Sequence, residues 1–177
     1  MLKLPTVGFN GRHSMPGKHD CRSGAVVVGP YRYLLWRAWN AKLPRLLWIL
    51  LNPSTADERV DDPTLRRVLG FSQSYGFGGL EVVNLFALRS PHPRALTQVV
   101  DPVGPENDMY IREALGRASK IVAAWGSFGT LYRRGHSILA QIDCPIYCLG
   151  ITKNGSPRHP LYLQHDRALR SFSLGKG

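Results

Sequence analysis

A run of six apolar residues, Leu46–Leu51, is the feature that most constrains the fold of this 177-residue chain. The run is too short for a typical helix, and its uniform apolar character is typical of a strand that is buried on both faces of a sheet. Pro53 must end the strand, because proline has no main-chain N–H to donate to a sheet ladder. We therefore predict a central strand that ends at Asn52, where a polar loop begins.

The remainder of the chain alternates between similar strand patterns and helix patterns. Two β-rich runs around Gly29-Pro30 predict a hairpin over residues 25–28 and 31–39. Asp62 and Pro63 fit the N-cap and first position of a helix that reaches about Tyr75. Further strands are predicted over residues 80–86, 120–125 and 145–149, and further helices over residues 107–119, 130–141 and 163–172.

This alternation predicts an α/β fold. We expect one three-layer sandwich domain over residues 25–177, with a mainly parallel four-stranded core sheet and the N-terminal β-hairpin at an edge. Residues 1–24 are rich in glycine, proline, histidine and basic side chains and show no period, so we interpret them as a basic flexible arm.

Two further features bear on where the protein acts. No run approaches the roughly 18 apolar residues of a membrane span, and no secretory signal is apparent, so we expect a cytoplasmic protein with no membrane partner. The three cysteines, Cys21, Cys144 and Cys148, are an odd number, which favours reduced thiols.

The net charge of +11 is unevenly distributed. Residues 1–45 contain eight Lys or Arg and one Asp, residues 150–177 contain five and one, and the segment between them is neutral. Basic ends that flank a neutral fold favour a polyanionic partner, and we expect nucleic acid, with DNA favoured over RNA. The alternative is a basic surface without any role in nucleic-acid binding.

Every predicted core strand ends in a polar residue or glycine. Because ligands bind at the carboxyl ends of the strands of an open α/β sheet, the loop that starts at Asn52 is expected to form the floor of a pocket. Asn84 lies in an apolar strand, where it is either satisfied within the core or reads a planar ligand through its amide. His159, held between two prolines, is either a surface residue or a neutral donor directed at a developing anion.

Other site chemistries receive less support from the sequence. Asp57, Asp61 and Asp62 could together hold Mg²⁺, but capping and loop roles fit them better, so no metal site is predicted. The chain has no Walker loop and no G-x-G-x-x-G, zincin or G-x-S-x-G motif, which disfavours kinase, dehydrogenase, metalloprotease and esterase activities. No cofactor is expected.

The chain from Tyr31 to Leu163 resembles domain-of-unknown-function family 1643. The segments that carry the resemblance include LLWILLNPSTAD, GGLEVVNLFALRS and CLGITKNGSPRHPLYL. The resemblance covers nearly the whole domain and implies no activity, because the family has none established.

The order of three motifs is similar, more distantly, to that of the uracil-DNA glycosylase superfamily. Its first motif, written G-x-N-P-G in several branches, corresponds to Leu50–Ser54; its base-reading asparagine corresponds to Asn84; and its His-Pro motif corresponds to His159-Pro160. The resemblance implies that Asn52 positions or activates water, Asn84 pairs with a flipped base and His159 stabilises the leaving base. Leu161 or Tyr162 would fill the gap in the duplex, although core packing is an equal alternative for both. The full set of substrate-binding residues predicted here is Pro53, Ser54, Thr55, Asn84, Arg89, Arg158, Leu161 and Tyr162, with Asn52 and His159 as the catalytic pair.

Two departures from this pattern affect the expected substrate. Leu50 and Ser54 replace the two glycines of the first motif, and the His-Pro is not followed by Ser-Pro. These changes are compatible with a different or modified base, a free nucleotide, or no glycosidic cleavage.

The leading hypothesis is therefore a nucleic-acid-directed glycosylase-like enzyme that cleaves the bond between a uracil-like or modified base and its sugar. One alternative is a non-catalytic DNA- or RNA-binding module on the same scaffold. Another is an enzyme that acts on a free nucleotide or a small anionic metabolite.

Overall fold

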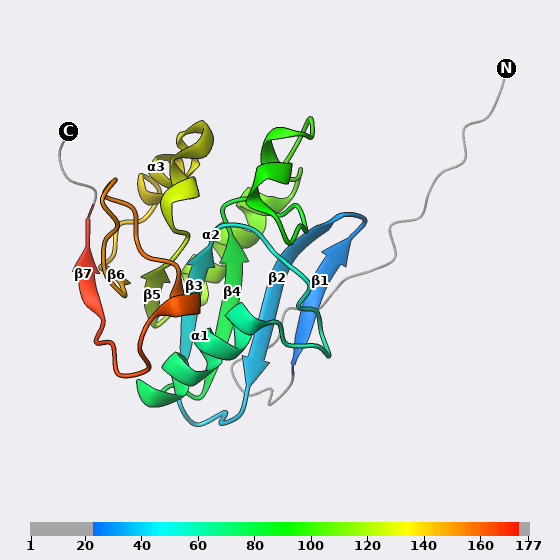
Figure 1. Ribbon diagram of the computed structural model, residues 1–177. Helices are drawn as coiled ribbons and strands as arrows, with labels where there is room; N and C mark the ends of the chain where they lie inside the picture. The colour runs from blue at the N-terminus through cyan, green and yellow to red at the C-terminus, as the bar shows by residue number, and fades with distance from the viewer. Residues whose placement is uncertain (1–22, 174–177) are drawn as a thin grey trace, which may run out of the picture.

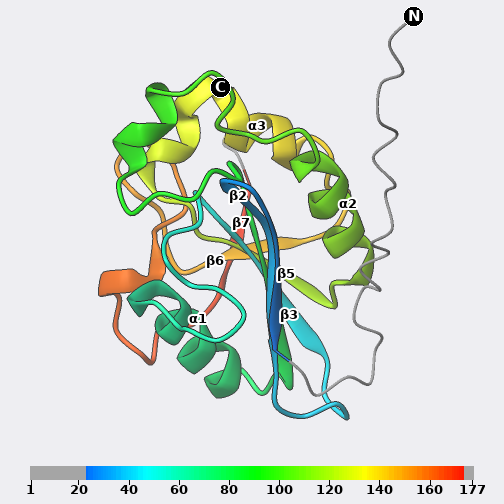
Figure 2. The same cartoon turned by 90° about the vertical axis from the view of Figure 1, so that its right-hand side faces the viewer.

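A computed structural model describes residues 23–173 of the chain, which form one seven-stranded mixed sheet with helices on both faces (Figures 1 and 2). The strand order is β1-β2-β4-β3-β5-β6-β7. The predicted α/β class is thus confirmed, with both parallel and antiparallel pairs in the sheet. The strands are β1 (Gly24–Val28), β2 (Tyr31–Ala38), β3 (Arg45–Leu50), β4 (Gly79–Asn84), β5 (Lys120–Ala123), β6 (Ile146–Cys148) and β7 (Arg170–Phe172). The helices are α1 (Pro63–Ser74), α2 (Asn107–Arg117) and α3 (Arg134–Leu139), and three 3-10 turns are η1 (Pro93–Thr97), η2 (Ser127–Arg133) and η3 (Pro160–Tyr162).

The pairing changes direction along the sheet. Parallel pairs join β4 to β3, β3 to β5 and β5 to β6, whereas β1 with β2, β2 with β4 and β6 with β7 are antiparallel. The first two strands form the predicted hairpin at one edge. Because the four strands joined by parallel pairs all run the same way, the loops that follow them lie at the same end of the sheet.

Strand β3 lies in the middle of the sheet and is covered on both faces. Trp48 belongs to the apolar cluster under α1, together with Leu65, Val68 and Phe71 of that helix. Ile49, the next residue, faces the opposite cluster, to which α2 and α3 contribute. This two-sided burial is the reason that the strand has no polar alternation in its sequence.

Helix α1 begins as its sequence predicts. The Asp62 carboxylate accepts the main-chain N–H of Leu65 at 2.7 Å, and Pro63 occupies the first turn, where its missing N–H has no cost. Further along the helix, the Trp48 indole N–H donates to the Ser72 hydroxyl at 3.0 Å, which fixes α1 to the centre of the sheet.

The predicted helix over residues 130–141 is only partly present. Tyr132 and Arg133 have φ values of 50° and 54°, in the left-handed region that side chains other than glycine rarely adopt. They are the last two residues of the 3-10 turn η2, and they break the helical path before the short helix α3 begins at Arg134. The helical period of the sequence does not reveal this break.

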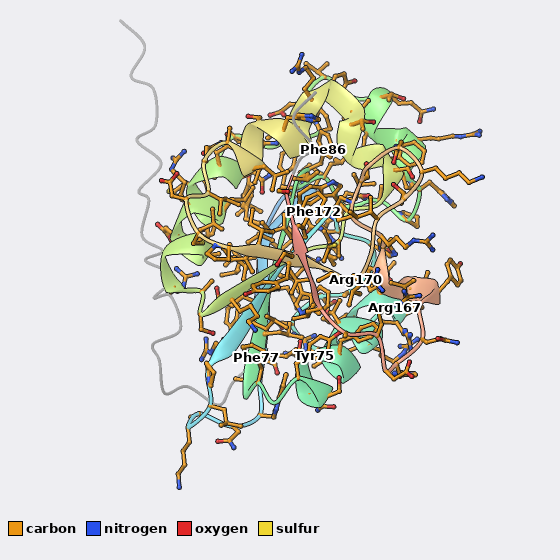
Figure 3. The ribbon with its side chains drawn as sticks, turned by 90° about the vertical axis from the view of Figure 1, so that its left-hand side faces the viewer. Tyr75, Phe77, Phe86, Arg167, Arg170 and Phe172 are labelled. Atoms are coloured by element: carbon orange, nitrogen blue, oxygen red, sulfur yellow. The ribbon has the colours of Figure 1, made fainter. Side chains whose placement is uncertain are left out.

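The predicted final helix over residues 163–172 is wrong. The segment runs along α1, where the Tyr75 hydroxyl donates to the main-chain oxygen of Arg167, and it ends in β7 on the edge of β6 (Figure 3). Leu163 and Leu169 pack against the cluster under α1, and Phe172 reaches the other cluster. Pairing with the open edge of β6 therefore outweighs the local helical pattern. The predicted arm over residues 1–24 lies, apart from its last two residues, outside the part of the chain that the structure describes.

Candidate functional site

A cavity of about 600 Å³ opens at the carboxyl ends of the parallel strands, on the α1 side of the sheet. Its walls come from the loops after β3, β4, β5 and β6, together with the start of α1 and part of β2. The volume lies within the range typical of pockets for small ligands. The polar lining residues are Arg32, Asn52, Ser54, Asp62, Thr64, Ser90, Ser127, His159 and Tyr162.

The topology explains why the cavity lies there. From β3 the chain passes to α1 on one face, and from β5 it passes to α3 on the other. The two loops diverge from neighbouring strands, which leaves a crevice between them. This is the switch point at which open α/β sheets bind ligands.

Asn52 connects two walls of the cavity. Its Nδ2 group donates to the main-chain oxygens of Ser90 at 2.9 Å and Pro53 at 3.0 Å. The Ser90 N–H in turn donates to the Pro53 oxygen at 2.8 Å, so the loops after β3 and β4 are bound together. With its two amide hydrogens engaged, Asn52 can offer a ligand only its acceptor, Oδ1.

His159 is partly buried on the opposite wall. Its Nδ1 accepts the main-chain N–H of Leu161 at 3.3 Å, so the neutral ring carries its proton on Nε2. Burial lowers the pKa of this imidazole, and the nearby Asp62 carboxylate only partly offsets the effect. At neutral pH, His159 is therefore an uncharged hydrogen-bond donor through Nε2.

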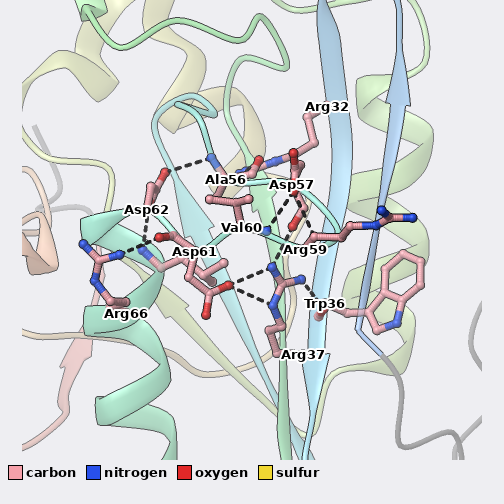
Figure 4. Close-up of polar contacts among 11 residues, drawn as sticks. Arg32, Trp36, Arg37, Ala56, Asp57, Arg59, Val60, Asp61, Asp62 and Arg66 are labelled. Atoms are coloured by element: carbon pink, nitrogen blue, oxygen red, sulfur yellow. Dashed lines mark hydrogen bonds and ion pairs between the residues drawn. The ribbon is translucent and has the colours of Figure 1, made fainter.

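Arg32, on β2, is the buried cation of the cavity and is 4% exposed. Its guanidinium donates to two neutral acceptors, the Ala56 oxygen at 2.8 Å (Figure 4) and the Asn84 Oδ1 at 3.3 Å, and its Nε has no partner among residues 23–173. No carboxylate within residues 23–173 lies at ion-pair distance from it. Desolvation lowers the pKa of Arg32 to about 10, with Asp62 acting in the opposite direction, so the side chain stays charged at neutral pH.

Asp62 is the carboxylate that lines the cavity. One of its oxygens caps α1 at Leu65, and the other accepts the Ala56 N–H at 3.4 Å. The helix-capping role expected from the sequence is therefore present. Among residues 23–173, no group of three or more His, Cys, Asp or Glu side chains is arranged to hold a metal ion.

Aromatic side chains surround the opening of the cavity. Trp125 is buried in the wall, whereas Phe128 is 49% exposed and Tyr162 is 92% exposed. Aromatic groups exposed beside a polar cavity are suited to stacking on a planar ligand.

The structure brings together five of the predicted site residues in this cavity: Asn52, Ser54, His159, Leu161 and Tyr162. Asn84 does not line it. Its Oδ1 accepts a hydrogen bond from Arg32, and its main-chain oxygen accepts one from the Asn107 amide at 3.0 Å. Its Nδ2 is buried and has no partner among residues 23–173. Pro53, Thr55, Arg89 and Arg158 also lie outside the lining.

Sequence reasoning missed Arg32, Trp125 and Phe128. A signal for Arg32 was available, because an arginine inside an otherwise apolar strand pattern must be buried or at an edge. Trp125 and Phe128 follow β5 at the same sheet end as Asn52, but only the fold brings them to the cavity.

The family comparison agrees with the extent of the domain. The model of the family described as protein of unknown function (DUF1643) matches residues 32–161, which include every residue of the cavity lining except Tyr162. The chain belongs to this family. No curated protein and no solved structure gives a significant match. Within residues 23–173, no helix has the length and apolar character needed to cross a membrane.

Proposed function

We propose that the cavity binds one nucleotide unit of a nucleic acid and catalyses hydrolysis of the bond between its base and its sugar. The observation that supports this most is that Asn52 and His159, which lie on different loops, both line one cavity. One offers an acceptor for a water molecule and the other a neutral donor for a base oxygen.

The chemistry needs no charged acid or base. A water molecule held by Asn52 Oδ1 forms a bond from its oxygen to C1′ of the sugar, while the bond from C1′ to the base nitrogen breaks. The electron pair leaves with the base, and its negative charge is stabilised by the hydrogen bond from His159 Nε2–H. The proton released by the water is finally taken up by the departed base, so the products are a free base and a sugar hydroxyl.

Two further observations support a nucleic-acid substrate. Phe128 and Tyr162 are exposed at the opening, where a base turned out of a strand would stack. The net charge of +11 favours binding to a polyanion. The uracil-DNA glycosylase-like, three-layer description of the fold belongs to this proposal, and it is supported by the parallel pairs that join β4, β3, β5 and β6.

The test is release of base from oligonucleotides. Single- and double-stranded DNA and RNA with uracil or a damaged base are incubated with the protein, and abasic sites are detected by alkaline cleavage of the strand. Abasic product is expected from at least one substrate, and His159→Ala should lower its rate about 100-fold, as loss of a single oxyanion donor does in other enzymes. His136→Ala, an exposed histidine on α3, is the matched control and should leave the rate unchanged. Absence of abasic product from every substrate would overturn the proposal.

A further inference from the structure

Arg32, which lines the cavity, and Asn84, which lies next to Arg32 behind the lining, are two buried side chains whose donors lack an acceptor among residues 23–173. We call the part of the cavity beside Arg32 its floor. Arg32 is 4% exposed and Asn84 is 1% exposed, and the atoms without partners are Nε of the arginine and Nδ2 of the asparagine. The two residues also contact each other, since Arg32 Nη2 donates to Asn84 Oδ1 at 3.3 Å. Buried donors are almost always paired in proteins. Among residues 23–173, six buried side-chain atoms lack a partner, and these two belong to residues that hydrogen-bond to each other beside the cavity.

The charge of Arg32 is as unusual as its donors. A buried cation normally has a carboxylate partner, because removing a charge from water is costly without one. The other two buried arginines among residues 23–173 follow that rule, because Arg37 forms an ion pair with Asp61 and Arg134 forms one with Asp108. Arg32 has two neutral acceptors instead, and it is the one of the three that lines the cavity.

The position of the pair fits a ligand group rather than a packing role. Leu50, which faces Asn84 in the register of β3 and β4, lines the cavity, as do Leu35 and Val82 beside it. Arg32 is 4% exposed and shares the cavity lining with these apolar side chains, and a hydrogen bond to an anion is stronger in such surroundings than in water. The exposed aromatic side chains Phe128 and Tyr162 lie at the other end, at the opening.

We propose that the floor of the cavity, formed by Arg32 and held in place by Asn84 behind it, is a binding site for the phosphate monoester of a nucleotide. A guanidinium matches the oxygens of a phosphate in geometry and charge, and hydroxyl groups of Ser54, Thr64 and Ser127 line the same cavity. With the phosphate at the floor, the sugar of the ligand would lie beside Asn52, and the base would lie beside His159 toward the aromatic opening.

This inference deepens the proposed function, on which it rests for the reaction, by naming the class of substrate. A phosphate monoester can come from a free mononucleotide or from the terminal nucleotide of a strand, whereas an internal nucleotide has only diesters. The inference predicts that the phosphate increases affinity because of Arg32, whether or not any bond is cleaved.

The experiment measures binding by calorimetry on the full chain. The probes are inorganic phosphate, the four common nucleoside 5′-monophosphates, the corresponding nucleosides, and one oligonucleotide with and without a 5′-phosphate. We expect each monophosphate to bind at least about tenfold more tightly than its nucleoside, as a charge-assisted bidentate contact provides. Arg32→Met should remove this difference, and Arg32→Lys should keep only part of it.

The matched control is Arg112→Met, which removes one exposed positive charge on α2, on the other face of the sheet, and should keep the tenfold preference. A comparison of the mononucleotides with the 5′-phosphorylated oligonucleotide shows which of them is the source of the phosphate. Tighter binding of free mononucleotides assigns the site to them, and tighter binding of the 5′-phosphorylated strand assigns it to a strand end; either result supports a phosphate monoester site.

Equal affinity for nucleotides and nucleosides in the wild-type protein would overturn the inference without any variant, as would full retention of the preference in Arg32→Met. The proposed reaction fails separately. Phosphate-dependent binding without release of base would leave the site in place and remove the glycosidic activity. If Arg32→Met released base at an unchanged rate from both phosphorylated and unphosphorylated strands, the glycosidic activity would stand and the phosphate site would be removed.

Discussion

Two arginines on the same strand, Arg32 and Arg37, are both buried, yet their surroundings differ (Figure 4). Every nitrogen of the Arg37 guanidinium has an acceptor. Nε and Nη2 donate to the Asp61 carboxylate at 3.0 and 2.8 Å, Nη2 also donates to the Asp57 oxygen, and Nη1 donates to the Trp36 oxygen. Arg32 has neutral acceptors for two nitrogens and none for the third.

The difference separates a structural charge from one that is available to a ligand. Asp57 and Asp61 belong to the loop between β3 and α1, so the contacts of Arg37 hold that loop against β2. Arg32 also contacts the loop, through Ala56, but no carboxylate among residues 23–173 lies at ion-pair distance from it, and Asp62 attracts it only from farther away. Fixing the loop does not by itself explain why the charge of Arg32 is buried without an ion pair.

The largest expected effect is the loss of the paired arginine. Arg37→Met should lower the free energy of unfolding by about 3 kcal/mol, because it removes several hydrogen bonds and leaves Asp61 without its partner. Arg32→Met should change it by less than about 1 kcal/mol, since the loss of two hydrogen bonds is offset by removal of an unpaired buried charge. Urea unfolding followed by circular dichroism measures both. Equal losses in the two variants would break the comparison.

A smaller effect is expected when only the charge of the partner is removed. Asp61→Asn keeps an oxygen that can accept from Arg37 but removes the negative charge, and we expect a loss of about 2 kcal/mol in the same unfolding assay. Glu58→Gln is the control, because Glu58 pairs only with the exposed Arg59 on the same loop. Its change should stay within about 0.5 kcal/mol. A stable Asp61→Asn variant would mean that Arg37 does not need a counter-ion, and the contrast with Arg32 would lose its basis.

Much of the fold could be predicted because it depends on local chemistry. Strand β3 ends at Leu50, two residues before the end predicted from Pro53, and Asp62 with Pro63 starts α1, as residue type alone suggests. The final helix could not be rejected in this way, because the segment becomes a strand only when β6 offers its open edge.

The site could be predicted only in part for the same reason. Asn52 and His159 lie in loops that follow the parallel strands β3 and β6, and such loops meet at one end of the sheet, so the sequence could indicate a cavity there. Arg32 and Arg37 look alike in the sequence, both arginines in one apolar strand. Which of them receives a carboxylate depends on the path of the loop after β3, and the order of residues does not specify that path.

The comparison can be reversed by giving Arg32 a carboxylate of its own. Asn84→Asp places a negative charge where Asn84 Oδ1 already accepts from Arg32, and it also removes the unpaired Nδ2 donor. We expect the variant to be about as stable as the wild type and to bind inorganic phosphate about tenfold more weakly, since the new carboxylate occupies and neutralises the guanidinium. Asn40→Asp adds the same charge in an exposed turn at the other end of the sheet and should bind phosphate normally. Unchanged phosphate binding by Asn84→Asp would separate the anion site from Arg32.

The smallest expected effect concerns His159, which shares the cavity with Arg32. Burial lowers the pKa of His159 in the native state. The unfolded chain therefore binds more protons than the native chain once the pH falls below about 6.5, the ordinary pKa of histidine. As a result, the free energy of unfolding decreases as the pH falls through this range. His159→Gln should therefore flatten the dependence of unfolding free energy on pH between about 7 and 5.

Sulfate, whose charge is constant over this range, should raise the His159 pKa in the wild type if the anion binds beside Arg32, and should not raise it in Arg32→Met. An NMR titration of the His159 ring proton measures the shift, and an equal response to sulfate in both proteins would place the anion somewhere other than the floor of the cavity.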